Sequence, residues 1–280
     1  MKGSAPEAPP APAPERSGSS YAAFWEETGA HFPSLKGAAS TAYYFECERT
    51  LFADFGARLG GARVLKTDLW DEAKNTEILR WAAEQGARPY GVDISFSIVR
   101  EARALLWPHR PGCVVGDVRA LPFPTGVFDL VYSMGTVEHF PETEVAVREI
   151  YRVLRPGGLA IVGVPNRLDP FLRPALVGLM RLADRYPYGM EKSYTAGALR
   201  RMLAAAGFEV TRTSGILFMP GWLRMLDLWL HTRRSRLAAL SGWLVQPFAW
   251  AYRRFPAVRR YGYLIAAAAI KPGGPGGSPA

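Results

Sequence analysis

Residues 116–140 read "GDVRALPFPTGVFDLVYSMGTVEHF", and this stretch decides the fold class. Its apolar run at 128–135 has the length of a buried strand and follows the turn residues "PFPTG". Just before it, residues 112–118 form another short apolar run that ends in Asp117-Val118. Short buried strands joined by longer connections are typical of a mostly parallel sheet that is covered by helices.

The same alternation continues on both sides of this stretch. The expected strands lie at 63–67, 88–95, 112–118, 128–135, 159–166, 208–215 and 261–271. Stretches with helical period lie at 75–86, 96–107, 143–154 and 195–206. We therefore predict an α/β fold with a doubly wound, mostly parallel seven-stranded sheet. Such a sheet binds its ligand at the carboxyl ends of the strands, where the strand order reverses.

Length and composition fit one such domain with additions, since 280 residues with 49% hydrophobic content can bury a full core. The expected units are a disordered tail at 1–20, a helical cap at 21–59, the core at 60–219, a basic aromatic helical insert at 220–260, the last core strand at 261–271 and a disordered tail at 272–280. No apolar run resembles a secretory signal or a spanning helix. Cys47 and Cys113 give no disulfide framework, which favours a cytoplasmic protein.

Two acidic residues follow expected strands and are candidates for nucleotide binding. Asp93 ends the second strand, where a carboxylate can accept hydrogen bonds from both hydroxyls of a ribose. The alternative is that Asp93 or Ser95 caps the next helix. Asp117 could accept from the amine of an adenine, with Val118 contributing its backbone amide, or could be an ordinary turn residue.

With "GDVRALPF", "FDLVYSMGTVEHF" and "REIYRVLRPGGLAIVGVPN" in this order, the chain resembles the class I S-adenosylmethionine-dependent methyltransferases, most closely the branch that methylates small molecules such as quinones and lipids. The resemblance covers roughly 60–220 and 261–271. It implies S-adenosylmethionine as the cofactor, with Asp93 at its ribose, Asp117 at its adenine and Ser133-Met134 beneath its methionine part. By motif position, the expected cofactor-binding residues are Lys66, Thr67, Asp68, Asp93, Ile94, Asp117, Val118, Ser133 and Met134.

The first motif departs from the family pattern. The family has an acidic residue and a turn of the form GxGxG here, because glycine lets the backbone approach the methionine part of the cofactor. This chain reads "RVLKTDLWDEAKN" at 63–75, with Lys66 at the acidic position and Asp68, Trp70 and Glu72 where glycines are expected.

Three explanations of this loop remain open. The cofactor binds in a shifted pose, with Lys66 pairing its carboxylate and Asp68 its ammonium. Alternatively, the loop has lost the cofactor and the protein is a non-catalytic binding or scaffold protein. In the third explanation Asp68, Asp71 and Glu72 hold a divalent ion for another transfer, although acids here also serve as ordinary charges at a helix N-terminus. We expect no metal site.

No catalytic residue is assigned from the sequence. Glu138-His139 follows the fourth strand, and histidine is the natural base near neutral pH, but we favour a structural hydrogen bond as the role of this pair. Tyr188 and Tyr194 bracket "GMEKS", which is either a lid or an ordinary surface loop. In the N-terminal cap, expected to form two short helices, Tyr43 and Tyr44 are candidates to line the acceptor pocket or to pack in the core.

The insert at 220–260 concentrates the positive charge of a chain whose net charge is +9. Its arginines are Arg224, Arg233, Arg234, Arg236, Arg253, Arg254, Arg259 and Arg260, against the single acid Asp227. Trp222, Met225, Leu226 and Trp229 fall on one helical face. Such a helix suits peripheral contact with an anionic membrane at the inner face, or a lid that packs on the core. Nucleic acid is not expected, because the apolar stretch at 237–252 is unlike a phosphate-binding groove.

From these features we expect methyl transfer from S-adenosylmethionine to a small, hydrophobic or lipid-like acceptor. The alternative is the non-catalytic protein.

Overall fold

The computed structural model describes residues 18–183, 186 and 188–273. Most of the two expected tails, 1–17 and 274–280, therefore lies outside the described residues. Residues 18–20, which we had placed in the N-terminal tail, begin helix α1 (Gly18–His31) instead.

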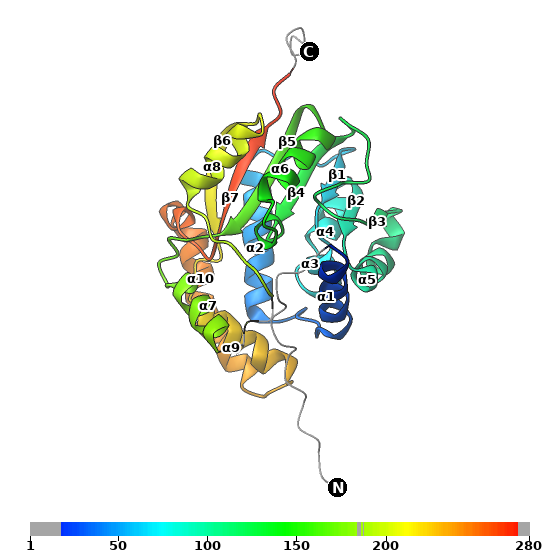
Figure 1. The fold of residues 1–280 in the computed structure, drawn as a ribbon. Coiled ribbons are helices and arrows are strands. Elements are labelled where there is room, and N and C mark those ends of the chain that lie inside the picture. The colour runs from blue at the N-terminus through cyan, green and yellow to red at the C-terminus, as the bar shows by residue number, and fades with distance from the viewer. Residues whose placement is uncertain (1–17, 184–185, 187, 274–280) are drawn as a thin grey trace.

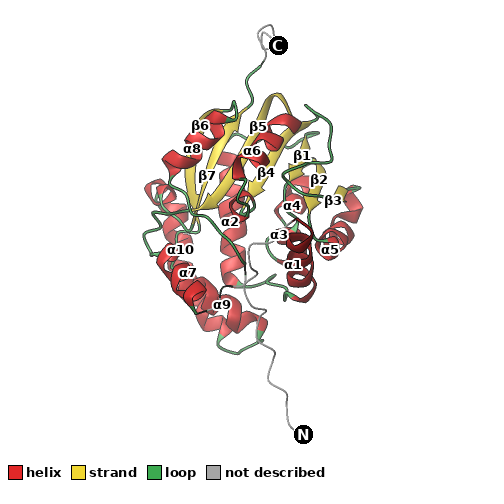
Figure 2. Cartoon of the chain, in the orientation of Figure 1, coloured by secondary structure: helices red, strands yellow, loops and turns green. Residues whose placement is uncertain are grey.

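The core is a seven-stranded sheet with the order β3-β2-β1-β4-β5-β7-β6 (Figures 1 and 2). The strands are β1 (Arg63–Lys66), β2 (Arg88–Asp93), β3 (Gly112–Val115), β4 (Phe128–Met134), β5 (Leu154–Pro165), β6 (Glu209–Ile216) and β7 (Leu264–Ile270). All pairings among β1 to β5 are parallel, and β7 runs antiparallel between β5 and β6. The predicted fold class is confirmed. The strand order reverses between β1 and β4, which places a ligand site at their carboxyl ends.

Helices cover both faces of the sheet, and side chains alternate between the two faces along each strand. The longer helices are α1, α2 (Ala39–Asp54), α5 (Phe96–Leu106), α6 (Thr143–Val153), α7 (Arg173–Leu182), α8 (Ala196–Ala205), α9 (Gly221–Thr232) and α10 (Ala238–Arg254). Apolar residues of α2, α5 and α10 pack on one face, and those of α6 and α8 pack on the other. In β7, for example, Ala266 and Ala268 belong to the first core and Ala267 and Ala269 to the second.

Three elements differ from the expectations. The helix expected at 75–86 is shorter in the structure, where α4 spans Ile78–Glu84. It begins late because Glu77 adopts a positive φ of 59°. A separate short helix, α3 (Trp70–Lys74), precedes it. Strand β5 begins at Leu154, five residues early, because Leu154 pairs with Phe128 ahead of a register shift. Helix α7 was not predicted, although Pro174 in its first turn is a usual start signal.

The insert is helical as expected, and a buried acid anchors it. Asp227 is buried and accepts hydrogen bonds from the Ser40 backbone amide at 2.7 Å and from the Ser241 hydroxyl at 2.7 Å. This carboxylate therefore joins α9 to α2 and α10. Arg253 and Arg259 add ion pairs from the insert to Glu46 and Asp54 of α2. Within the described residues, no helix is both long enough and apolar enough to cross a bilayer.

Candidate active site

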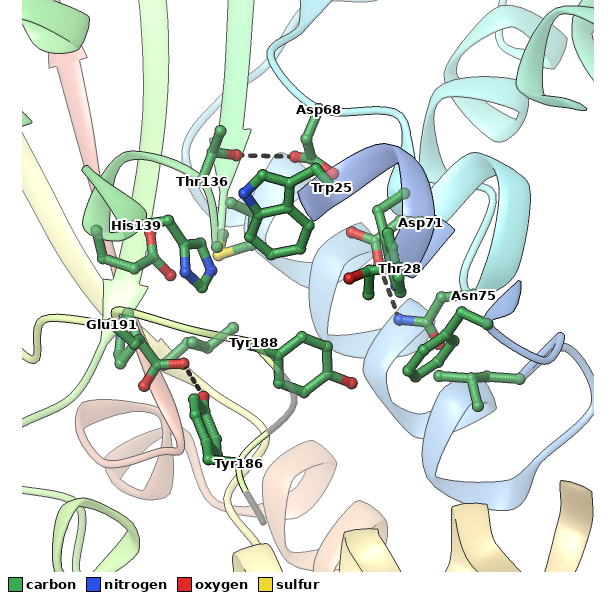
Figure 3. Close-up of a pocket in the computed structure, with 18 of the residues that line it drawn as sticks. Trp25, Thr28, Asp68, Asp71, Asn75, Thr136, His139, Tyr186, Tyr188 and Glu191 are labelled. Carbon is green, nitrogen blue, oxygen red and sulfur yellow. Dashed lines mark hydrogen bonds between the residues drawn. The ribbon is translucent and has the colours of Figure 1, made fainter. Parts of the chain in front are cut away.

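A cavity of about 1040 Å³ lies at the carboxyl ends of β1, β2 and β4. Its walls come from helix α1, the loop between β1 and α3, the segment after β4, and helices α7 and α9, together with Tyr186, Tyr188 and Glu191. Figure 3 shows these last three residues beside Trp25, Asp68, Thr136 and His139. Its volume is at the upper end of the roughly 300–1,000 Å³ of sites that hold drug-sized ligands. A cavity of this size has room for a nucleotide cofactor together with a second molecule.

Seven of the nine expected cofactor-binding residues line this cavity. They are Thr67, Asp68, Asp93, Ile94, Asp117, Val118 and Met134. Lys66 and Ser133 are fully buried and do not line it. The sequence pattern thus located the cavity, because the carboxyl ends of parallel strands meet at one edge of the sheet.

Asp93 keeps acceptor capacity for a ligand. One carboxylate oxygen accepts from the Leu69 amide at 2.8 Å, and the other accepts from the Ser95 amide at 2.9 Å. Each oxygen retains a lone pair that a ribose hydroxyl can use. The other role considered for Asp93 or Ser95, capping the next helix, is filled by Ser95. Its hydroxyl accepts from the Ile98 amide at the start of α5. Burial raises the pKa of Asp93 to about 7, although both amides oppose this shift.

This pKa predicts a pH dependence of cofactor binding. The ionised carboxylate is the better acceptor for two hydroxyls, and its fraction falls as the pH drops below about 7. We expect the affinity for S-adenosylmethionine to fall by up to about tenfold per pH unit below that point. Titration calorimetry between pH 5.5 and 8.5 measures this, and Asp93→Asn should remove the Asp93-dependent part of the curve. A wild-type curve parallel to that of the variant would contradict the assignment.

Lys66 does not play the role that we expected for it. Its ammonium lies 3.0 Å from the carbonyl oxygen and 3.0 Å from a carboxylate oxygen of Asp68, and 3.4 Å from a carboxylate oxygen of Asp71. These three partners use all three donor hydrogens of the ammonium. Burial lowers the pKa of Lys66, but Asp68 and Asp71 more than compensate and raise it above the ordinary value. Lys66 is therefore a buried counter-ion beneath the loop, and the pairing with the cofactor's carboxylate is wrong.

Glu72 and the metal explanation are corrected in the same way. The carboxylate of Glu72 accepts from the Leu79 amide at 2.8 Å and from the Arg80 amide at 3.3 Å, so it caps helix α4. A lysine ammonium already lies between Asp68 and Asp71. Among the described residues, no three His, Cys, Asp or Glu side chains are grouped to hold a metal ion.

The glycine-free loop is accommodated by a glycine in the neighbouring strand. Leu69 is fully buried, and a Cβ on Gly91 of β2 would lie 2.4 Å from a methyl carbon of Leu69. Leu69 therefore points into the core against Gly91, and its amide remains directed at Asp93. The close approach that glycine gives the family loop is obtained here by turning the Leu69 side chain away from the cavity.

The segment after β4 forms the wall next to the β1 loop, because β4 pairs with β1. Gly135 has a φ of +72°, which favours glycine, and the Thr136 hydroxyl donates to Asp68 at 2.9 Å and joins the two segments (Figure 3). Glu138 is only 1% exposed, and one of its carboxylate oxygens has no hydrogen-bond partner. Burial, and then the nearby Glu191, raise the pKa of Glu138 well above its ordinary value. This oxygen is available to hydrogen-bond a polar group of a ligand or a water molecule.

His139 is fixed in one tautomer. Its Nδ1 lies 2.8 Å from the carbonyl oxygen of Met190, so Nδ1 carries the hydrogen and Nε2 keeps its lone pair. Burial lowers the pKa of His139, which keeps the ring neutral near pH 7. The structural hydrogen bond is thus present, and it leaves Nε2 free to act as a base.

Tyr186 and residues 188–191 form a packed wall. Arg173 of α7 holds Glu191 through two hydrogen bonds of 2.6 and 2.8 Å, and the Tyr186 hydroxyl donates to the same carboxylate (Figure 3). Tyr188 lines the cavity, whereas Tyr194 anchors the segment by a hydrogen bond to Thr143. The surface-loop alternative for "GMEKS" is therefore wrong.

Other candidates divide between cavity and core. Tyr44 lines the cavity, and Tyr43 packs against Tyr252 in the core. Asp117 lines the cavity while its carboxylate is paired with Arg119 at 2.7 Å. The sequence reasoning missed Trp25, Thr136 and the Arg173–Glu191 pair. Thr136 could have been found, since it follows β4 by two residues, whereas no local pattern links residues 173 and 191.

Comparison with known proteins agrees with this geometry. Residues 73–162 match the model of a methyltransferase domain family, and the match begins just after the altered loop. A protein of Mycolicibacterium smegmatis, described as a probable S-adenosylmethionine-dependent methyltransferase, is 28% identical over 188 residues, which are 67% of this chain and 68% of that protein. The 2-methyl-6-phytyl-1,4-hydroquinone methyltransferase of Synechocystis is 28% identical, over 63% of this chain and 57% of that protein.

A crystal structure of an S-adenosylmethionine-dependent methyltransferase from Mesorhizobium loti shares the fold. It superposes with a TM-score of 0.56 at 18% identity, over 85% of this chain and all of that one. The family match over residues 73–162, the sequence relatives and the shared fold together support a class I S-adenosylmethionine-dependent methyltransferase. This methyltransferase is accordingly an enzyme whose cofactor is S-adenosylmethionine.

The residues present fit that cofactor despite the altered loop. Asp93 has free lone pairs at the ribose position, Gly135 leaves the β4 end open, and Glu72 is turned away from the cavity. Trp70 lies on the wall of the cavity, and a volume of about 1040 Å³ remains. The ribose would be held by Asp93 and the adenine by the wall at Asp117-Val118.

Proposed function

We propose that this methyltransferase acts on a lipid-like acceptor that enters from an anionic membrane between α7 and α9. The observation that carries the proposal is the continuity between the cavity and an exposed apolar surface. Met225 and Trp229 of α9 line the cavity, and they are also 44% and 50% exposed.

The exposed apolar surface extends over three helices, which lie together below one end of the sheet in Figure 1. We call it the α7–α9–α10 face; its exposed members are Leu179, Leu182, Trp222, Met225, Leu226, Trp229, Leu240, Trp243, Leu244 and Trp250. The helical face predicted at Trp222–Trp229 thus exists and is directed outward, while Leu223 and Leu230 pack inward. Large apolar side chains exposed on neighbouring helices favour contact with a partner or a membrane.

The charge around this face favours anionic lipid. Arg233, Arg234, Arg236 and Arg254 have no ion pair with any described residue. Tryptophan suits the headgroup level of a bilayer, and arginine suits the phosphates beside it. A face that carries both, at the mouth of a largely apolar cavity, supports an acceptor with a long hydrocarbon part. The quinol relative found in the comparison is named for such a substrate.

Methyl transfer requires few chemical steps from the protein itself. When bound, S-adenosylmethionine supplies a methyl group on its sulfonium. The walls of the cavity hold the acceptor atom in line with that group and exclude water. If the acceptor atom is a hydroxyl oxygen, His139 would take its proton at Nε2, since Nδ1 is held by Met190. Glu138 would hydrogen-bond a polar group of the acceptor through its unpartnered oxygen.

The test compares two acceptors and one surface variant. Labelled methyl transfer is measured to a prenylated hydroquinone in phosphatidylcholine–phosphatidylglycerol vesicles and to its short, water-soluble analogue. In wild type, we expect transfer to the long-chain acceptor to exceed transfer to the short one. The variant Trp222→Ser/Leu226→Ser should lose at least about tenfold of the vesicle reaction and little of the soluble one. Trp107→Ser is the matched control, since Trp107 is 66% exposed but lies outside the α7–α9–α10 face. Equal use of both acceptors, or no effect of the variant, would overturn the proposal.

A further inference from the structure

The tryptophan that stands in place of a family glycine belongs to an aromatic wall of the cavity. Trp70 contacts three other rings, with centroid distances of 6.2 Å to Trp25, 4.8 Å to Phe32 and 6.4 Å to Tyr188. The planes meet at 80°, 62° and 78°, so the rings pack edge to face. All four rings are half-buried and line the cavity.

The position of Trp70 relative to the ribose site follows from the loop. The amide of Leu69 donates to Asp93, and Trp70 is the next residue, one Cα spacing away. The sulfonium of S-adenosylmethionine is joined to the ribose through a single carbon. Asp68 and Thr136, which are hydrogen-bonded to each other, border the same part of the cavity (Figure 3). The aromatic wall therefore borders the region into which a ribose held by Asp93 would direct the sulfonium.

The carboxylates that line the cavity favour a cation there. Asp68 and Asp71 share the single ammonium of Lys66, and Asp93 accepts hydrogen bonds from two backbone amides. The two arginines of the cavity are already engaged: Arg173 with Glu191, and Arg224 with the ring of Tyr44 and the carbonyl oxygen of Ser40. Ring faces and carboxylates attract cations and do little for a neutral thioether of the same shape.

We propose that Trp70, with Trp25, Phe32 and Tyr188, forms a cation-selective wall that distinguishes the sulfonium cofactor from its neutral, demethylated product. The side chain of Trp70 then gives the loop a function that a glycine in its place cannot supply. The wall attracts the positively charged cofactor, and this attraction is lost when the cofactor becomes the neutral product. The inference rests on the cofactor of the family and is independent of the acceptor.

The test measures binding, without turnover, by titration calorimetry. The ligands are S-adenosylmethionine, S-adenosylhomocysteine and sinefungin, which carries an amine at the position of the sulfonium. The measured quantity is the ratio of the Kd for S-adenosylhomocysteine to the Kd for each cationic ligand. We expect Trp70→Leu to lower both ratios by about tenfold, because a desolvated cation–π contact has about that weight.

Two further variants make the result decisive. Trp70→Phe keeps a ring and should preserve most of the discrimination, which also covers the case that Trp70→Leu does not fold. Trp81→Leu, in α4 and outside the cavity, should leave both ratios unchanged. Equal weakening of all three ligands by Trp70→Leu, or loss of discrimination in Trp70→Phe equal to that in Trp70→Leu, would show that Trp70 provides packing alone and would overturn the inference. A failure of the lipid-like acceptor in the vesicle assay would leave these ratios unaffected.

Discussion

Asp93→Asn is expected to lower the affinity for S-adenosylmethionine by at least about 100-fold at pH 8. Two hydrogen bonds to a charged acceptor contribute roughly 1.5–3 kcal/mol each, and about 1.4 kcal/mol corresponds to a tenfold change in affinity. The asparagine side chain also places an NH₂ group against the amide of Leu69 or Ser95, where the carboxylate now accepts from both. Titration calorimetry with the cofactor and with S-adenosylhomocysteine measures the loss.

The control for this prediction is Asp117→Asn. Asp117 shares its carboxylate with Arg119 and its side chain is 27% exposed, so its substitution should weaken binding much less than that of Asp93. Unfolding followed by circular dichroism establishes that both variants remain folded. If Asp93→Asn binds as tightly as wild type, the ribose does not lie at the end of β2, and the inferred position of the sulfonium at Trp70 fails with it.

Lys66→Met is expected to produce the largest loss of stability. Removing one partner of a buried ion pair costs about 3–5 kcal/mol, because the remaining charge is buried without compensation. Here two carboxylates, of Asp68 and Asp71, would face each other without the ammonium. We expect the Tm to fall by on the order of 10 °C, measured by circular dichroism.

The pKa of Lys66 determines the pH range in which this loss of stability is expected. The folded-state pKa of Lys66 lies above its ordinary value, so its contribution is complete at neutral pH and is lost only in strongly alkaline solution. The defect of Lys66→Met should become smaller in acid, where the carboxylate of Asp68, whose pKa is raised by burial, takes up a proton. Adding Asp71→Asn should restore part of the stability.

Lys36→Met is the comparison for an exposed pair. Lys36 and Glu77 form an ion pair in which both side chains are 27% exposed, and such pairs contribute roughly 0–1 kcal/mol. A Lys66→Met variant that is no less stable than Lys36→Met would show that the ammonium of Lys66 is not needed to hold the loop.

The altered first motif is best understood as a rebuilt loop. Three of its side chains have structural partners: Lys66 is a counter-ion, Leu69 fills the space left by Gly91, and Glu72 caps α4. These contacts hold the backbone so that the Leu69 amide and the Asp68 carboxylate remain at the cavity. The loss of glycine therefore does not imply the loss of the cofactor, and the family membership of the chain is consistent with its geometry.

The local pattern of apolar and polar residues determined much of the fold and part of the candidate site. The period of apolar residues placed all seven strands and most helices, because backbone hydrogen bonding and burial act on neighbouring residues. The position of Asp93 and Asp117 after their strands then put both at the cavity, since parallel strands end at a common edge. The exposed face of α9 was also readable, because helical spacing fixes which side chains lie on one side.

Only the tertiary structure decided the direction and the partners of the charged and aromatic side chains. Lys66, Glu72 and Trp70 lie within seven residues of sequence, yet one points under the loop, one toward α4 and one into the cavity. Trp25 meets Trp70, and Arg173 meets Glu191, across separations that no local pattern encodes. Rotamers and long-range contacts are set by the space and charge that remain after the strands and helices have packed.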